Sequence, residues 1–180
     1  MQDFIGDLLD FFWKNAENFI LMNGHYPPLL QGFEYRRENS VYLQDLVDFI
    51  PEKDWSDPDR RFETYLEAFQ KRREANLPGF VSISESLLTV VNSEELDNLG
   101  FPIDNLQELK NLQKDFPGLF EKCEALTIYL EYKNTARLTW ARIFRTDSIV
   151  NHLSEYVECT GNQIDGLLRN ARNIVYKASG

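Results

Sequence analysis

Histidine and cysteine, the side chains that most often serve as metal ligands, are scarce in this chain of 180 residues, which has two of each. A structural zinc site needs about four ligands in a fixed geometry. His152 and Cys159 are seven residues apart, two turns if the segment is helical, so one ion could not easily be bound by both. We therefore predict no metal site and no cofactor. Cys123 and Cys159 are expected to be two buried or half-buried free thiols, although pairing depends on spatial geometry.

Long apolar runs and nucleotide-binding loops are also missing. No run reaches the roughly 18 to 20 apolar residues that a membrane span needs. The apolar N-terminal pieces are interrupted by Asp3, Asp7, Asp10 and Lys14, which is unlike a signal peptide. These absences predict a cytoplasmic protein that does not cross a membrane. The lack of a G-x-G-x-x-G or Walker-type loop disfavours dinucleotide and nucleoside-triphosphate chemistry.

Basic residues are too few for broad nucleic-acid binding, because the chain has a net charge of -10. The charge is uneven: residues 1–133 have a net charge of -12 and residues 134–180 a net charge of +2. This C-terminal region contains the candidate residues for binding an anion, a nucleic acid or an acidic partner: Arg137, Trp140, Arg142, Arg145, Arg169 and Arg172. The alternative is that these arginines form ion pairs with neighbouring carboxylates.

The chain is rich in the hydrophobic and aromatic residues that form a protein core. Its composition is 43% hydrophobic and 13% aromatic, with 13 phenylalanines. Low hydrophobicity is the signature of disorder, so this composition predicts a folded chain in which aromatic packing is prominent. The length suits a single domain over residues 1–180.

The segment 124–145 predicts a β-hairpin and thereby argues against a plain helical bundle. Apolar residues at 126, 128 and 130 alternate with Thr127, Tyr129 and Glu131, and a similar alternation runs through 137–145. Alternation of period two, with β-branched and aromatic residues around a turn at 133–135, is typical of paired strands.

Other segments complete an α+β pattern. The spacing of apolar residues predicts helices at 3–22, 58–75, 148–156 and 164–178, with one or two more in a polar excursion at 92–121. Further strands are predicted at 29–35, 40–46 and 80–91, and a loop at 51–59. We expect an antiparallel or mixed sheet of about five strands, packed against N-terminal, central and C-terminal helices.

Three residues are candidates for lining a ligand pocket. His25 precedes Pro27 and Pro28, which hold the backbone extended and could fix the ring in a cleft. Glu34 and Glu85 fall on predicted strands, as do two other carboxylates, Glu124 and Glu131. Ser84 and Ser86 flank Glu85, but no nucleophile elbow surrounds them, which disfavours nucleophilic catalysis.

The segment Gly24-His25-Tyr26-Pro27-Pro28, followed by Ser84-Glu85-Ser86 near the end of a strand, resembles uncharacterised small bacterial α+β proteins. Those proteins share an N-terminal helix and a G-H-x-P-P segment that leads into a strand. They have no assigned activity, so the resemblance implies a layout and no chemistry.

The sequence names no reaction. The function that we favour is a non-enzymatic domain that binds a protein partner or forms a homo-oligomer. The first alternative is a small hydrolase-like or ligand-binding protein that uses His25, Glu34 and Glu85. The second is a subunit of a nucleoprotein assembly that uses the C-terminal arginines, the one way in which nucleic acid is expected as a partner.

Overall fold

The computed structural model describes residues 3–36, 40–91, 94, 98, 106–159 and 166–177. The described helices are α1 Phe4–Asn23, α2 Glu52–Ser56, α3 Pro58–Glu74, α5 Leu106–Asp115, η1 Pro117–Leu119 and α6 Gly166–Lys177. The strands are β1 Leu29–Arg36, β2 Ser40–Asp45, β3 Gly79–Val91, β4 Phe120–Tyr132, β5 Thr135–Thr146, β6 Ile149–Leu153 and β7 Val157–Cys159.

The seven described strands form one antiparallel sheet, six of them in the order β2-β1-β3-β4-β5-β6. β7 pairs with β5 at Leu138–Trp140, while β6 pairs with the later part of β5 from Ile143 onward. The predicted α+β class is confirmed. The sheet is larger than the expected five strands because two short strands line the free edge of β5.

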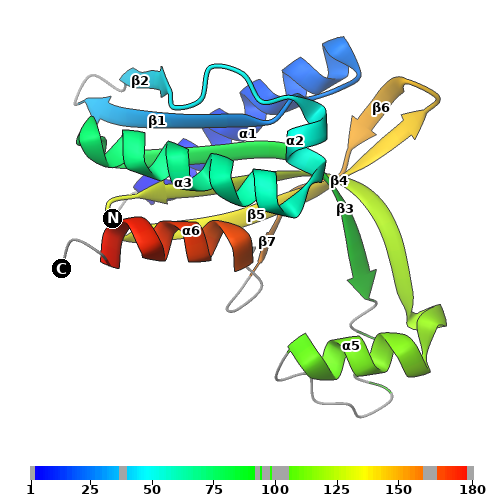
Figure 1. The fold of residues 1–180 in the computed structure, drawn as a ribbon. Helices are drawn as coiled ribbons and strands as arrows, with labels where there is room; N and C mark the ends of the chain where they lie inside the picture. The colour runs from blue at the N-terminus through cyan, green and yellow to red at the C-terminus, as the bar shows by residue number, and fades with distance from the viewer. Residues whose placement is uncertain are drawn as a thin grey trace.

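Helices cover both faces of the sheet, α1 on one side and α3 and α6 on the other (Figure 1). α1 directs its apolar stripe, which includes Leu8, Phe12, Ala16 and Ile20, into a core shared with β3, β4 and β5. The second core lies under α2, α3 and α6 and contains buried aromatic residues from helices and strands alike. We call the two sides of the sheet the α1 face and the α3/α6 face.

The predicted hairpin is confirmed as β4 and β5, with Tyr132 paired to Thr135 across a two-residue turn. Lys133 in this turn adopts a left-handed conformation with φ of 55°. Ile128 and Leu130 lie in the core on the α1 face, whereas Tyr129 lies in the core on the α3/α6 face. The period-two pattern therefore gave the correct face for each side chain.

β3 and β4 continue beyond the rest of the sheet as a two-stranded ribbon. They pair from Gly79 with Tyr132 out to Val91 with Phe120, while β5 pairs with β4 only as far as Ala125. The ribbon leads to η1 and α5, at a distance from the two cores (Figure 1). Much of the predicted excursion at 92–121 lies outside the described residues.

Two predicted elements are wrong. The segment predicted as a helix at 148–156 forms β6 and the start of the connection to β7, because the edge of β5 offers backbone partners and Val150 fills the core under α1. The segment predicted as a loop at 51–59 contains α2, which buries Trp55 in the second core. In both cases tertiary packing outweighed a weak local pattern.

Candidate functional site

Two clusters of carboxylates and arginines lie on opposite faces of the sheet. The edge cluster consists of His25, Glu85, Glu124 and Arg145, at the point where α1 ends. The buried cluster consists of Arg72, Tyr129, Glu131 and Arg172, between the sheet and the helices α3 and α6. Together they contain four of the nine residues predicted as binding candidates: three in the edge cluster, and Arg172 in the buried cluster.

The backbone around Gly24 brings α1 to the edge cluster. Gly24 ends the helix with φ of 75°, a conformation that glycine adopts without steric cost, and its N–H donates to the carbonyl of Ile20. A Cβ atom here would lie 2.5 Å from the carbonyl oxygen of Ser148. Glycine is thus required both for the turn and for the close approach of the β5–β6 connection, and the chain then leads through His25 into β1.

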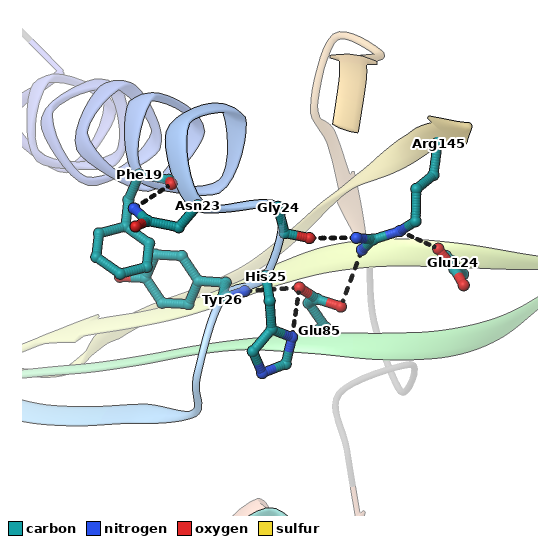
Figure 2. Close-up of polar contacts among 8 residues, drawn as sticks. All are labelled: Phe19, Asn23, Gly24, His25, Tyr26, Glu85, Glu124 and Arg145. Carbon is teal, nitrogen blue, oxygen red and sulfur yellow. Dashed lines mark hydrogen bonds and ion pairs between the residues drawn. The ribbon is translucent and has the colours of Figure 1, made fainter. Parts of the chain in front are cut away.

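Glu85 is the acceptor at the centre of the edge cluster (Figure 2). Its Oε1 accepts a hydrogen bond of 2.6 Å from the backbone N–H of Tyr26 and lies 3.1 Å from Nδ1 of His25. Its Oε2 lies 3.2 Å from Nη2 of Arg145. One carboxylate on β3 therefore holds both the residues that follow α1 and a guanidinium from β5.

Arg145 connects three segments (Figure 2). Its Nε donates to Glu124 on β4 at 2.9 Å, its Nη2 pairs with Glu85, and its Nη1 donates to the carbonyl of Gly24. The last of these bonds satisfies a carbonyl at the end of α1 that has no partner within the helix. Arg145 thereby fixes the helix end to the sheet.

The edge cluster offers a histidine oriented by a carboxylate, an arrangement that general bases use. A nucleophile is needed beside it, but the hydroxyls of Ser84 and Ser86 bond to Thr127 on the opposite face of the sheet. This follows from the strand itself, because neighbours of Glu85 in β3 point to the other side. The His25 side chain is 55% exposed, so the pair lies open to solvent.

Glu34, the third predicted pocket residue, does not join His25 and Glu85. Phe33 of β1 pairs with Gly79 of β3, so Glu34 lies about seven residues from Glu85 along the strand direction. At about 3.3 Å per residue the separation is about 23 Å. Glu34 is exposed and forms an ion pair of 3.9 Å with Arg36.

The buried cluster is built around Glu131, whose side chain is only 1% exposed. Its Oε1 accepts from Arg72 at 3.0 Å and from Arg172 at 2.8 Å, and its Oε2 accepts from Arg172 at 2.7 Å and from the hydroxyl of Tyr129 at 2.9 Å. Arg172 thus binds the carboxylate with two nitrogens, the strong bidentate geometry. Arg72 also donates to the carbonyls of Leu77 and Pro78.

Burial and charge act in opposite directions on this carboxylate. Burial alone would raise the pKa of Glu131, but the hydrogen bonds and positive charges of Arg172 and Arg72 outweigh it and lower the pKa below its ordinary value. Burial raises the pKa of the neighbouring Tyr129, and the negative charge of Glu131 raises it further. The cluster is therefore an ionised carboxylate between two guanidinium groups, with a neutral phenol as donor.

The predicted arginine group is divided between the two faces. On the α1 face Arg137 pairs with Asp3 and Glu158, and Arg145 belongs to the edge cluster. On the α3/α6 face Arg142 pairs with Glu121 at 2.5 Å and Arg172 with Glu131. All four arginines therefore form ion pairs with carboxylates, which is the alternative that the sequence analysis left open.

The remaining two C-terminal candidates, Trp140 and Arg169, do not belong to these ion pairs. Trp140 is half-buried on β5 between Thr127 of β4 and Val157 of β7. Arg169 is half-buried on α6 and, among the described residues, has no ion-pair partner. The thiols of Cys123 and Cys159 are free, as predicted, and burial raises the pKa of both.

Sequence reasoning did not find Arg72. A usable signal was present: Arg72 follows Phe69 by three residues and Tyr65 by seven, so it lies on the buried stripe of α3. A charged residue on such a stripe needs a buried counter-charge. Glu131, on the same face of its strand as Tyr129, supplies it.

Comparison of the chain with known protein families, with curated proteins and with solved structures finds no match in any of the three. The resemblance to small bacterial proteins with a G-H-x-P-P segment accordingly stays a prediction. Among the described helices, none has the length and apolar character needed to cross a membrane. The described residues also contain no group of three or more His, Cys, Asp or Glu side chains placed to hold a metal ion.

Proposed function

We propose that this protein is a binding domain without a catalytic activity of its own, and that a protein partner docks on the surface around the edge cluster. The observation that carries the proposal is a set of exposed apolar side chains around this cluster. We call Phe19, Met22 and Leu87 the apolar rim; their exposed fractions are 43%, 85% and 67%.

Each member of the apolar rim adjoins the edge cluster. The Phe19 ring contacts the Tyr26 ring edge to face at 5.1 Å, and the Tyr26 backbone bonds Glu85 (Figure 2). Met22 lies in the last turn of α1, two residues before Gly24. Leu87 pairs with Glu124 in the register of β3 and β4. Exposed apolar side chains next to polar groups are typical of protein-binding surfaces.

The charge of the chain favours a different protein over a second copy. A net charge of -10 makes two copies repel each other, whereas a neutral or basic partner surface is attracted. The pocket alternative loses support because Glu34 is about 23 Å from Glu85 along the strands. The nucleoprotein alternative loses support because four of its arginines are already engaged by carboxylates.

The test compares capture of proteins from an extract of the source organism by the immobilised wild type and by the double variant Met22→Lys, Leu87→Lys. The control is Phe49→Lys, which alters an equally open apolar residue, 78% exposed, beside Leu46 and Ile50 of the α3/α6 core. We expect a protein that the wild type and the control retain and that the rim variant retains at least tenfold less.

Equal retention of every captured protein by the rim variant and the wild type would contradict the proposal. Light scattering on the same proteins separates the two kinds of partner. A dimer that the rim substitutions dissociate would assign the surface to a second copy and overturn the assignment to a different protein. A monomer that retains its extract partner supports the proposal as stated.

A further inference from the structure

A hollow of about 300 Å³ opens beside the buried cluster, on the α3/α6 face. It is lined by Tyr129 and Glu131 of β4, Asn134 and Ala136 at the β4–β5 turn, and Arg169, Arg172 and Asn173 of α6. Six of these seven residues have a side chain with a polar group. The volume is at the lower end of the range for small-molecule sites, about 300 to 1,000 Å³.

The charges around this hollow do not cancel. Glu131 is the one carboxylate in the buried cluster, while Arg72 and Arg172 both pair with it. One positive charge therefore remains in the cluster, and Arg169 in the wall of the hollow adds a second. This excess lies in a chain whose net charge is -10, so it is a local feature and not a general property of the surface.

The donors that line the hollow are available. Arg172 uses Nε and Nη2 on Glu131, which leaves Nη1 without a hydrogen bond among the described residues. Within the same described part of the chain, the side chains of Asn134, Arg169 and Asn173 have no hydrogen-bond partner. Two guanidinium groups and two amides can thus donate to one ligand without breaking an existing contact.

Arg172, one of the residues that line the hollow, is held in place before any ligand arrives. Its bidentate bond to Glu131 fixes the guanidinium plane, and the ring of Tyr176 lies 5.2 Å from its Cζ. Donors that are already ordered lose little entropy on binding, which favours affinity for a small ligand.

We propose that this hollow binds a small oxyanion, a phosphate or a carboxylate group, through Arg169 and Arg172 with the amides of Asn134 and Asn173. Guanidinium groups and amides are the side chains that recognise such oxygens by charge-assisted hydrogen bonds. Glu131 does not touch the anion in this site; it positions Arg172. The site is separate from the apolar rim, which lies on the other face of the sheet, so either proposal can fail without the other.

The experiment is an NMR titration of the uniformly ¹⁵N-labelled full chain, observing backbone amides and arginine Nε–Hε groups. Inorganic phosphate and succinate are added in separate series at constant ionic strength, with sodium chloride as the reference salt. We expect saturable shifts of the Arg169 and Arg172 Nε–Hε signals with at least one of the two anions. Comparison of the two series identifies whether the site prefers phosphate or carboxylate.

The decisive variant is Arg169→Gln, because Arg169 takes no part in the contacts of Glu131 and its loss leaves the buried cluster complete. We expect the affinity for the effective anion to fall at least tenfold, and Asn173→Ala to lower it by a smaller factor. Lys14→Gln, which removes one positive charge from an exposed position of α1 on the opposite face, is the matched control and should bind as the wild type does. The absence of saturable shifts with both anions, or equal affinity of Arg169→Gln and the wild type, would overturn the proposal.

Discussion

The edge cluster and the buried cluster use the same chemistry in two different environments. Each has a glutamate from an inner strand of the sheet and an arginine that reaches it from another element. Glu131 is 1% exposed and meets two arginines, whereas Glu85 is 23% exposed and meets one arginine, one histidine and one backbone N–H. Comparing the two clusters distinguishes ion pairs that stabilise the fold from ion pairs whose side chains stay accessible to a binding partner.

The two clusters differ in how far water can reach their charged groups. In the buried cluster the side chains of Arg72 and Glu131 are only 5% and 1% exposed, so water compensates poorly when either of them loses its partner. In the edge cluster water can replace a lost partner, so the contacts contribute less to stability and can rearrange when another molecule arrives. We therefore expect folding stability to depend on the buried cluster and partner binding to depend on the edge.

The largest loss of folding stability is expected for Glu131→Gln. The substitution removes the negative charge and leaves Arg72, 5% exposed, and Arg172 facing each other without a counter-charge. Breaking a buried pair in this way costs about 3 to 5 kcal/mol of unfolding free energy, which urea denaturation measures. The control is Glu121→Gln, which removes an exposed partner of Arg142 and should leave the denaturation midpoint unchanged. A loss for Glu131→Gln no greater than that of the control would abolish the distinction between the two clusters.

The sequence predicted the parts of this fold whose local pattern and tertiary role agree. The apolar stripe of α1 and the alternation of β4 and β5 each bury one face, so periodicity was sufficient. It failed at 148–156, where a pair of β-branched residues and a short apolar spacing suit either a helix turn or a strand. The free edge of β5 decided that segment, and an edge is a product of the sheet that no local window contains.

The sites divide in the same way. His25 and Glu85 were predicted as members of one pocket and lie 3.1 Å apart, but Glu34 was included only because it also falls on a strand. Strand register, which places Glu34 near the opposite end of β1, is set by the pairing of β1 with β3. Similarly, the arginines of β5 alternate between faces, so neighbours in sequence such as Arg142 and Arg145 belong to different surfaces.

A smaller effect is expected for Glu85→Gln. The amide oxygen can still accept from the Tyr26 N–H, while the ionic contact with Arg145 is lost. For a partly exposed pair that keeps one hydrogen bond, a loss of about 1 kcal/mol is expected. Urea denaturation of Glu85→Gln, Arg145→Gln and the double variant would give the coupling energy, which should be positive and below that of the Glu131 pairs. A loss as large as for Glu131→Gln would mean that the edge cluster is as closed to water as the buried one.

The smallest expected effect on the free energy of unfolding occurs only at alkaline pH. It is tested by comparing Tyr26, beside the edge cluster, with Tyr129 in the buried cluster. Burial raises the pKa of Tyr26 to about 12 from an ordinary value near 10. A raised pKa means that the folded state holds the proton more tightly. Its contribution to stability is therefore complete below about pH 10 and is lost as the pH rises toward 12.

In the Tyr26→Phe variant the ring at this position cannot ionise. Its free energy of unfolding should therefore equal that of the wild type near pH 7, and by pH 11 it should have fallen by about 1 kcal/mol less than that of the wild type. Urea denaturation at pH 7, 10 and 11 measures this difference. Tyr129→Phe should flatten the alkaline profile in the same direction, because its pKa is also raised, but it should already be less stable at pH 7 since it loses the hydrogen bond to Glu131. Parallel profiles for Tyr26→Phe and the wild type would show that this phenol ionises without cost to folding, and the end of α1 would then be more open to water than its contacts imply.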